Sequence, residues 1–115
     1  MRIIPLAPLP KPRMTRSDKW KQRKCVVAYR RWCDQLRKHI DTIPDELQVV
    51  FAIPMPASWS AKRRASMDGE PHQQRPDLDN LLKALMDATK KDDSHVHSIQ
   101  AKKIWAIDAR IELHQ

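Results

Sequence analysis

Proline placement limits most strongly how this chain can fold. The 115 residues include nine prolines but only one glycine, so turns must depend mainly on proline and on Asn or Asp. Proline lacks the amide hydrogen that a helix interior or a central strand needs, so regular elements must lie between prolines. On this basis residues 2–6 form a short edge strand that Pro8, Pro10 and Pro12 end, and residues 11–18 form a basic loop.

Hydrophobic spacing predicts one helix and one strand in the next part of the chain. Residues 19–41 contain neither Pro nor Gly, and their apolar residues recur at helical intervals, which predicts a helix. The residues that share its apolar face are Trp20, Val27, Leu36 and Ile40. Apolar residues then alternate over 47–53, which predicts a strand that ends at Pro54.

The second half of the chain supplies another helix and two more strands. Residues 55–76 are predicted to be a loop with one helical turn near 59–66. A helix over 79–90 follows, because its apolar residues have amphipathic spacing: Leu78, Leu81, Leu82, Leu85 and Met86. Of two strands after residue 94, the second has Ile107, Ala109, Ile111 and Leu113 on one face. The order β-α-β-loop-α-β-β predicts an α/β (α+β) protein, a single domain over 1–115 with a small mixed β-sheet and helices on one face.

Positive charge is concentrated near the start of the chain. The formal net charge is +8 and the pI is about 9.9, and residues 1–33 alone carry ten Lys or Arg against one acid, Asp18. This excess favours a polyanionic partner, either nucleic acid or an acidic membrane surface. There is no apolar run of 18 residues and no signal peptide, so we expect a cytoplasmic protein without a membrane partner. Cys25 and Cys33 would lie about 12 Å apart along the predicted helix, too far for a disulfide.

The run Arg75-Pro76-Asp77-Leu78-Asp79-Asn80 is the strongest candidate for a functional site. Pro76 favours extended backbone before it, and in an extended chain Asp77 and Asp79 would project to the same side. Asp79 is expected to be the N-cap of the helix that follows, with Lys83 one turn along the same face. A second acidic pair, Asp92 and Asp93, comes just after that helix.

Two interpretations of these acids remain open on the residues alone. Carboxylates are preferred Mg²⁺ ligands, and Mg²⁺ binds through a few acids plus substrate phosphate, so the acids could form a metal site in a basic protein. Lys83 would add a positive charge for a phosphate. Alternatively, Asp and Asn at a helix start are ordinary caps, and Asp92-Asp93-Ser94 is an ordinary solvated turn.

The stretch RPDLDNLLKALMDA, followed by DDSHV and a closing strand, resembles the RusA-like family of Holliday junction resolvases, which is common in phages and prophages. KPRMTRSDKW and SWSAKRRASMDGEPHQQRPD share the resemblance, which thus covers most of the chain. It implies a small mixed α/β fold and a homodimer that nicks two strands of a four-way DNA junction in recombination and repair. Mg²⁺ would be the cofactor, with Mn²⁺ as a substitute and no small-molecule cofactor.

The resemblance also implies roles for individual residues. Asp77, Asp79 and Asp93 would bind the metal, with Asp92 as an alternative because the preceding segment is shorter than in some members. Lys83 would be the catalytic lysine. A homodimer fits this reaction, because two cuts related by two-fold symmetry need two active sites.

Basic residues outside the acidic run are candidates for contacts with the DNA backbone. They are Lys11, Arg13 and Arg16 in the first basic segment, Lys62, Arg63 and Arg64 in a loop expected to be flexible, and Arg75. Trp59 could stack on a base or could instead belong to the core or a dimer interface, and we expect His72 to face solvent or substrate. The alternatives to a resolvase are a non-catalytic basic nucleic-acid-binding phage protein and a general nuclease for flaps or branched DNA.

Overall fold

The computed structural model describes residues 1–13, 23–89 and 94–114. Its elements in chain order are β1 (Arg2–Ile4), α1 (Lys24–Arg37), β2 (Glu46–Pro54), α2 (Ala61–Met67), α3 (Leu78–Ala88), β3 (Ser98–Ala106) and β4 (Arg110–His114). This is the predicted order of strands and helices, with α2 as a short helix in the predicted loop. The mixed α+β fold class is therefore confirmed for the described residues.

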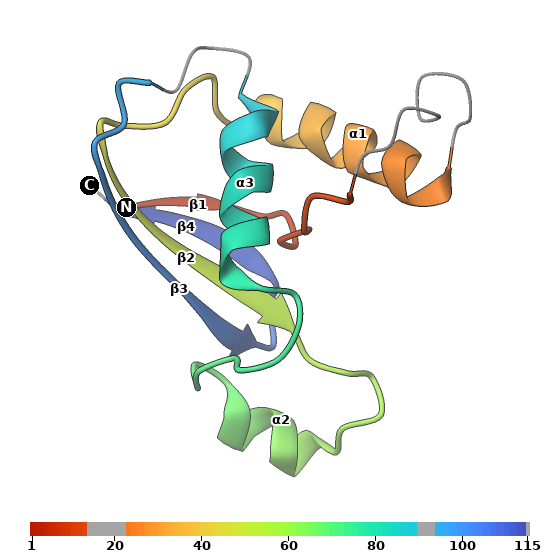
Figure 1. Ribbon diagram of the computed structural model, residues 1–115. Helices are drawn as coiled ribbons and strands as arrows, with labels where there is room; N and C mark the ends of the chain where they lie inside the picture. Colours follow the sequence, from red (N-terminus) through yellow and green to blue (C-terminus); the bar gives the residue numbers. More distant parts are fainter. Residues whose placement is uncertain (14–22, 90–93, 115) are drawn as a thin grey trace.

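The four strands form one mixed sheet with the order β1-β4-β2-β3. β4 pairs antiparallel with both β1 and β2, whereas β2 and β3 are parallel. Parallel neighbours need a crossover connection, and the segment containing α2 and α3 supplies it. Figure 1 shows that α1 and α3 cover one face of the sheet, while α2 lies beyond its end.

The core lies between the covered face of the sheet and the two long helices. The alternating residues of β2 face it as predicted, and all four are buried: Leu47, Val49, Phe51 and Ile53. From α3, Leu81 and Leu85 are fully buried, which confirms the predicted apolar face. On α1 the predicted Leu36 is buried, but Val26 rather than Val27 enters the core, together with Tyr29, Trp32 and Cys33. The predicted Trp20 lies outside the described residues.

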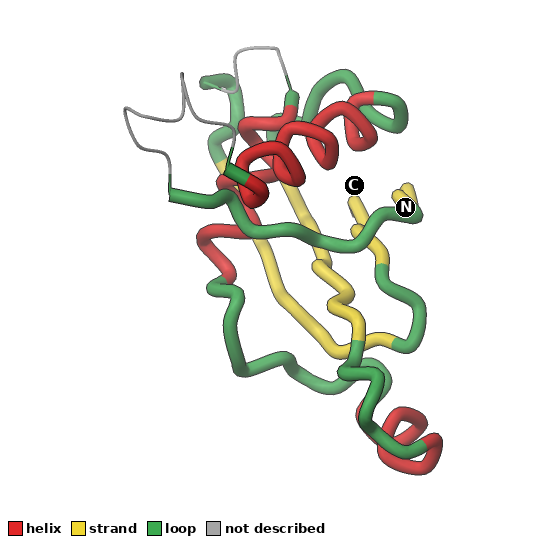
Figure 2. Tube along the Cα trace, turned by 90° about the vertical axis from the view of Figure 1, so that its right-hand side faces the viewer, coloured by secondary structure: helices red, strands yellow, loops and turns green. Residues whose placement is uncertain are grey.

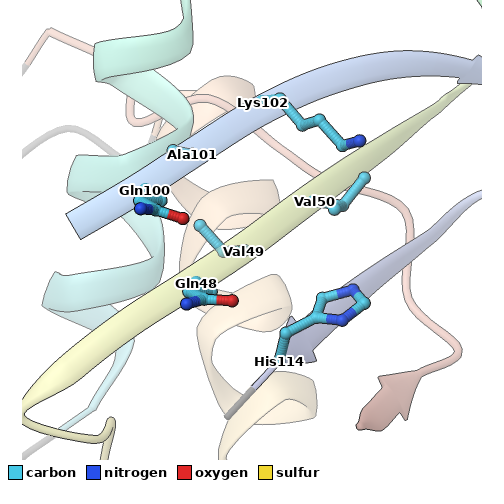
Figure 3. Close-up of a pocket in the computed structure, with 7 residues that line it drawn as sticks. All are labelled: Gln48, Val49, Val50, Gln100, Ala101, Lys102 and His114. Atoms are coloured by element: carbon cyan, nitrogen blue, oxygen red, sulfur yellow. The ribbon is translucent and has the colours of Figure 1, made fainter.

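The opposite face of the sheet has a polar groove that no described helix covers (Figure 3). Gln48, Gln100, Lys102 and His114 surround Val50 there. Glu112, which lies opposite Val50 on β4, accepts hydrogen bonds from Arg110 Nε at 2.6 Å and pairs with His114 Nε2 at 3.2 Å. Burial alone would raise the pKa of Glu112, but these two partners lower it below its ordinary value.

Three predicted boundaries differ from those in the structure. β1 ends at Ile4 instead of residue 6, because Pro5 cannot donate to the strand ladder. α1 ends at Arg37 instead of residue 41, and Ile40 enters the core from the turn that follows. Ile107 lies in the connection that crosses the end of β2 to reach β4, so it is 48% exposed and belongs to no strand face.

The described helices and the two cysteines bear on two further expectations. No helix in residues 1–13, 23–89 and 94–114 is long and apolar enough to cross a membrane. Both cysteines are free thiols, consistent with their predicted separation, and Cys25 is exposed whereas Cys33 is buried.

Candidate active site at the start of α3

Asp77, not Asp79, is the N-cap residue of α3. Its backbone is extended, and its carbonyl accepts from the amides of Asn80 at 3.1 Å and Leu81 at 3.2 Å. The Asp77 carboxylate makes no capping hydrogen bond, and it has no other hydrogen bond or ion pair within the described chain. The prediction that Asp79 caps the helix is therefore wrong, and the capping role does not occupy the carboxylate of Asp77 either.

Asp79 and Lys83 form an exposed pair on the first turns of α3. Asp79 is already helical, so the expectation that an extended backbone aligns it with Asp77 is also wrong. The predicted relation to Lys83 is confirmed, because the Lys83 ammonium lies 3.8 Å from the Asp79 carboxylate at i, i+4. Both side chains are about two-thirds exposed, at 69% for Asp79 and 64% for Lys83. Solvent therefore reaches both groups, and each can turn towards a ligand.

Residues 5–13, here called the N-terminal segment, run beside α1 and α3 (Figure 2). The Trp32 indole donates to the Ala7 carbonyl at 2.8 Å, and the Lys11 amide donates to the Asn80 carbonyl at 3.3 Å. The Lys11 ammonium forms an ion pair with Asp87 of α3. These contacts hold the N-terminal segment against the helix that carries the acids.

The N-terminal segment brings positive charge next to Asp77 at the start of α3. An open hollow of about 540 Å³ is lined by Pro10, Lys11, Arg75, Pro76, Asp77 and Asn80. A neighbouring one is lined by Lys11, Pro12, Arg13, Asn80 and Lys83. Three of the predicted DNA-contacting residues, Lys11, Arg13 and Arg75, therefore lie beside Asp77 and Lys83. The predicted Arg16 lies outside the described residues.

The other predicted cations belong to α2, which is a helix rather than a flexible loop. Ser60 caps it by accepting from the Arg63 amide at 3.2 Å. The Arg63 guanidinium lies 3.9 Å from the ring centre of Trp59, and Arg64 donates to the Pro56 carbonyl at 3.0 Å. Lys62 is exposed and makes no such contact with the described residues, so of the three it is the cation most available to a ligand.

An aromatic cluster joins α2 to the sheet. The Trp59 and Trp105 ring centres are 4.8 Å apart, and the His72 and Trp105 ring centres are 4.3 Å apart. Trp59 thus packs on β3, which favours the structural alternative for this residue. His72 is only 4% exposed, so the prediction that it faces solvent or substrate is wrong. Burial, assisted by the charge of nearby Lys103, lowers the pKa of His72 below its ordinary value.

Sequence reasoning missed Lys103 of β3. Its ammonium donates to the backbone carbonyls of Gln74 and Pro76, three residues and one residue before Asp77. The available signal was its position two residues from both Ala101 and Trp105, on the strand face that the helices cover. A lysine on such a face needs polar partners, and the strand pattern alone does not identify them.

The chemistry of the acidic pair fits Mg²⁺. Two exposed carboxylates at one helix start supply hard oxygen donors, and Mg²⁺ usually takes one or two carboxylates, several waters and substrate phosphate. Within the described residues, no group of three or more His, Cys, Asp or Glu side chains is placed to hold a metal. The predicted third ligand, Asp93, and its alternative Asp92 lie outside those residues.

Comparison with known proteins gives one match. The family model described as Endodeoxyribonuclease RusA matches residues 5–114, which include the N-terminal segment and every element from α1 to β4. No curated protein and no solved structure matches the chain.

Proposed function

Because this chain belongs to the RusA family of endodeoxyribonucleases, we propose that it cuts four-way DNA junctions by Mg²⁺-dependent hydrolysis of phosphodiester bonds. The observation that carries the proposal is the start of α3. There, the exposed Asp79 carboxylate lies beside Lys83, and the Asp77 carboxylate, which makes no capping hydrogen bond, lines a hollow with Lys11 of the N-terminal segment. Carboxylates that can bind a metal ion and basic side chains that can bind DNA phosphates thus lie close together on one surface. The corresponding cellular setting is recombination and repair of DNA in the cytoplasm of a bacterial or phage-infected cell.

Asp77 and Asp79 are the proposed metal ligands, and Asp93 or Asp92 completes the set. A Mg²⁺ ion bound there supplies Lewis-acid chemistry, which lowers the pKa of a coordinated water and offsets phosphate charge. Lys83 is proposed to neutralise charge on the scissile phosphate, which requires its ammonium to leave Asp79. The exposed pair at 3.8 Å allows this at small cost, since such pairs contribute about 0.3–0.5 kcal/mol.

Two groups of cations are proposed to hold the DNA backbone. Lys11, Arg13 and Arg75 line the hollows beside it, and the chain continues from the first two to Arg16. Lys62, Arg63 and Arg64 form a second basic surface on α2. Contacts to phosphates supply salt-dependent affinity and orientation without reading sequence, which suits an enzyme that selects a DNA shape.

A homodimer is part of the proposal, because paired symmetric cuts need two copies of the site related by a two-fold axis. Sedimentation of the protein alone and with a synthetic four-way junction tests it. We expect a dimer in both conditions. A monomer in both, at concentrations where junctions are cut, contradicts the dimer.

The direct test of the function is a panel of synthetic DNA substrates incubated with Mg²⁺. Wild type is expected to give paired, symmetric nicks in the four-way junction and little cutting of linear duplex. Asp77→Asn is expected to bind the junction and leave it intact, because the substitution changes the charge of a side chain that has no described contact. Equal cutting of linear duplex, flaps and junctions would establish a general nuclease instead. Junction binding without any metal-dependent cutting would establish a non-catalytic binding protein.

A further inference from the structure

Lys103 connects the sheet to the segment that carries the proposed site. It lies in β3 opposite Phe51 of β2, so its side chain leaves the sheet on the face that α1 and α3 cover. Its ammonium nitrogen lies 2.5 Å from the carbonyl oxygen of Gln74 and 2.8 Å from that of Pro76. A lysine has three hydrogen-bond donors, and two of them are thus directed at backbone oxygens.

Both carbonyls belong to residues 73–76, here called the strap, which lead from the edge of β3 to the start of α3. The chain before the strap pairs with β3, since the Gly69 amide donates to Trp105 at 2.8 Å and the His72 amide to Lys103 at 3.1 Å. The chain after it is held by α3, because the Asp77 carbonyl accepts the first helical hydrogen bonds. Among the described residues, Lys103 supplies the side chain that binds the strap to the sheet.

The bond to Pro76 bears directly on Asp77. The Pro76 carbonyl oxygen and the Asp77 nitrogen belong to one planar peptide unit, so a donor that fixes the oxygen also fixes the start of Asp77. The Asp77 side chain has no hydrogen bond or ion pair within the described residues. The described contacts of Asp77 therefore fix the position of its backbone, from which the carboxylate extends.

We infer that Lys103 is a positioning residue of the nuclease site: by binding the Gln74 and Pro76 carbonyls, it holds Asp77 where its carboxylate can share a divalent cation with Asp79. This inference rests on the proposed function, since it assigns Lys103 to the metal site of that reaction. Lys103 acts through the strap and does not itself contact the metal or the DNA. Removing groups that orient metal ligands typically weakens metal binding or activity about 10- to 100-fold.

The neighbouring Lys102 supplies a matched control. It carries the same charge one residue away, but its side chain lies on the uncovered face of the sheet (Figure 3). Lys103→Met removes both hydrogen bonds while keeping much of the side-chain length, Lys103→Arg keeps charged donors, and Lys102→Met removes one charge at the control position. Any general effect of lost positive charge on DNA binding is common to the two Met variants.

The first measurement uses Mn²⁺ alone and no DNA. Paramagnetic broadening of the Asp77 and Asp79 amide NMR signals reports cation binding at this site. We expect Lys103→Met to need about 10- to 100-fold more Mn²⁺ than wild type, with Lys103→Arg restored towards wild type and Lys102→Met unchanged. In cleavage assays Lys103→Met should need more Mg²⁺ than wild type for half-maximal rate. Its junction affinity in Ca²⁺ should match that of Lys102→Met.

Each remaining outcome decides the inference. A folded Lys103→Met that binds Mn²⁺ like Lys102→Met overturns it, as does an arginine variant that is no better than Met. If Lys103→Met loses its NMR dispersion and so does not fold, Lys103→Gln replaces it, because glutamine keeps a neutral hydrogen-bond donor. Lys103→Gln should bind Mn²⁺ with an affinity between those of wild type and a variant without the donor. A Lys103→Gln variant with wild-type Mn²⁺ affinity overturns the inference. Lys103-dependent Mn²⁺ binding without junction cutting sustains it while the proposed function fails. No broadening at Asp77 in wild type at millimolar Mn²⁺ overturns both.

Discussion

Asp79→Asn separates a catalytic role from a structural one, because the structure predicts very different magnitudes for the two. Asp79 has two described stabilising relations: the exposed i, i+4 pair with Lys83 and its place in the first turn of α3. Such a pair contributes about 0.3–0.5 kcal/mol, and a first-turn carboxylate gains about 0.3–1 kcal/mol from the helix dipole. The free energy of unfolding should therefore fall by about 1 kcal/mol, which lowers Tm by roughly 4–8 °C in a domain near this size.

The effect on cleavage should be far larger if Asp79 binds the metal. Metal-ion catalysis supplies several kcal/mol of transition-state stabilisation. Losing about 4 kcal/mol of it slows the chemical step about a thousandfold. Asn has nearly the same shape as Asp, so junction affinity should remain close to that of wild type.

Thermal unfolding, junction binding in Ca²⁺ and single-turnover cleavage in Mg²⁺ together measure these three quantities. Asp34→Asn on α1 is the matched control, since Asp34 is 71% exposed and pairs with Arg37 at i, i+3. Because Asp34 lies in the last turn of α1, where a carboxylate gains nothing from the helix dipole, the control should lose at most the ion-pair contribution and keep full cleavage activity. Cleavage by a folded Asp79→Asn within tenfold of wild type would refute the ligand role. Loss of folding or of junction binding would show that the carboxylate is structural.

Three further predictions concern the core, the buried histidine and α2. Leu85→Ala, at a fully buried position of α3, should cost about 3–5 kcal/mol in urea unfolding; a cost below 1 kcal/mol would contradict the described core. The lowered pKa of His72 means that the unfolded chain takes up a proton first as pH falls below about 6.5, so stability should drop there. His72→Phe keeps a ring against Trp105 and should flatten that part of the stability profile in pH-dependent melts, whereas an unchanged slope would exclude His72 as its source. Lys62→Gln should reduce the slope of log junction affinity against log salt by about 1, and a slope equal to that of wild type would remove α2 from the DNA surface.

Local sequence patterns predicted the parts of this protein that depend on neighbouring residues. The alternation in β2 and the spacing in α3 identified the residues that enter the core, because strand and helix periodicity sets which side chains share a face. The same geometry placed Lys83 beside Asp79. The element order followed from these patterns together with proline positions, and it limited the fold to a small mixed sheet with helices on one face.

Tertiary structure decided how the candidate site is assembled, because its supporting contacts join residues that are distant in the chain. Lys103 reaches the strap across 27 and 29 residues, and Trp32 holds Ala7 across 25. The N-cap residue of α3 was also predicted wrongly. Asp77 and Asp79 both suit a helix start, and the path of the strap decides which of them begins the helix. The buried position of His72 depends on Trp105 of β3, which is distant in the sequence. The sequence alone thus determined which residues of β2 and α3 share a face, whereas only the packed chain determined which distant groups hold the acidic run at the start of α3.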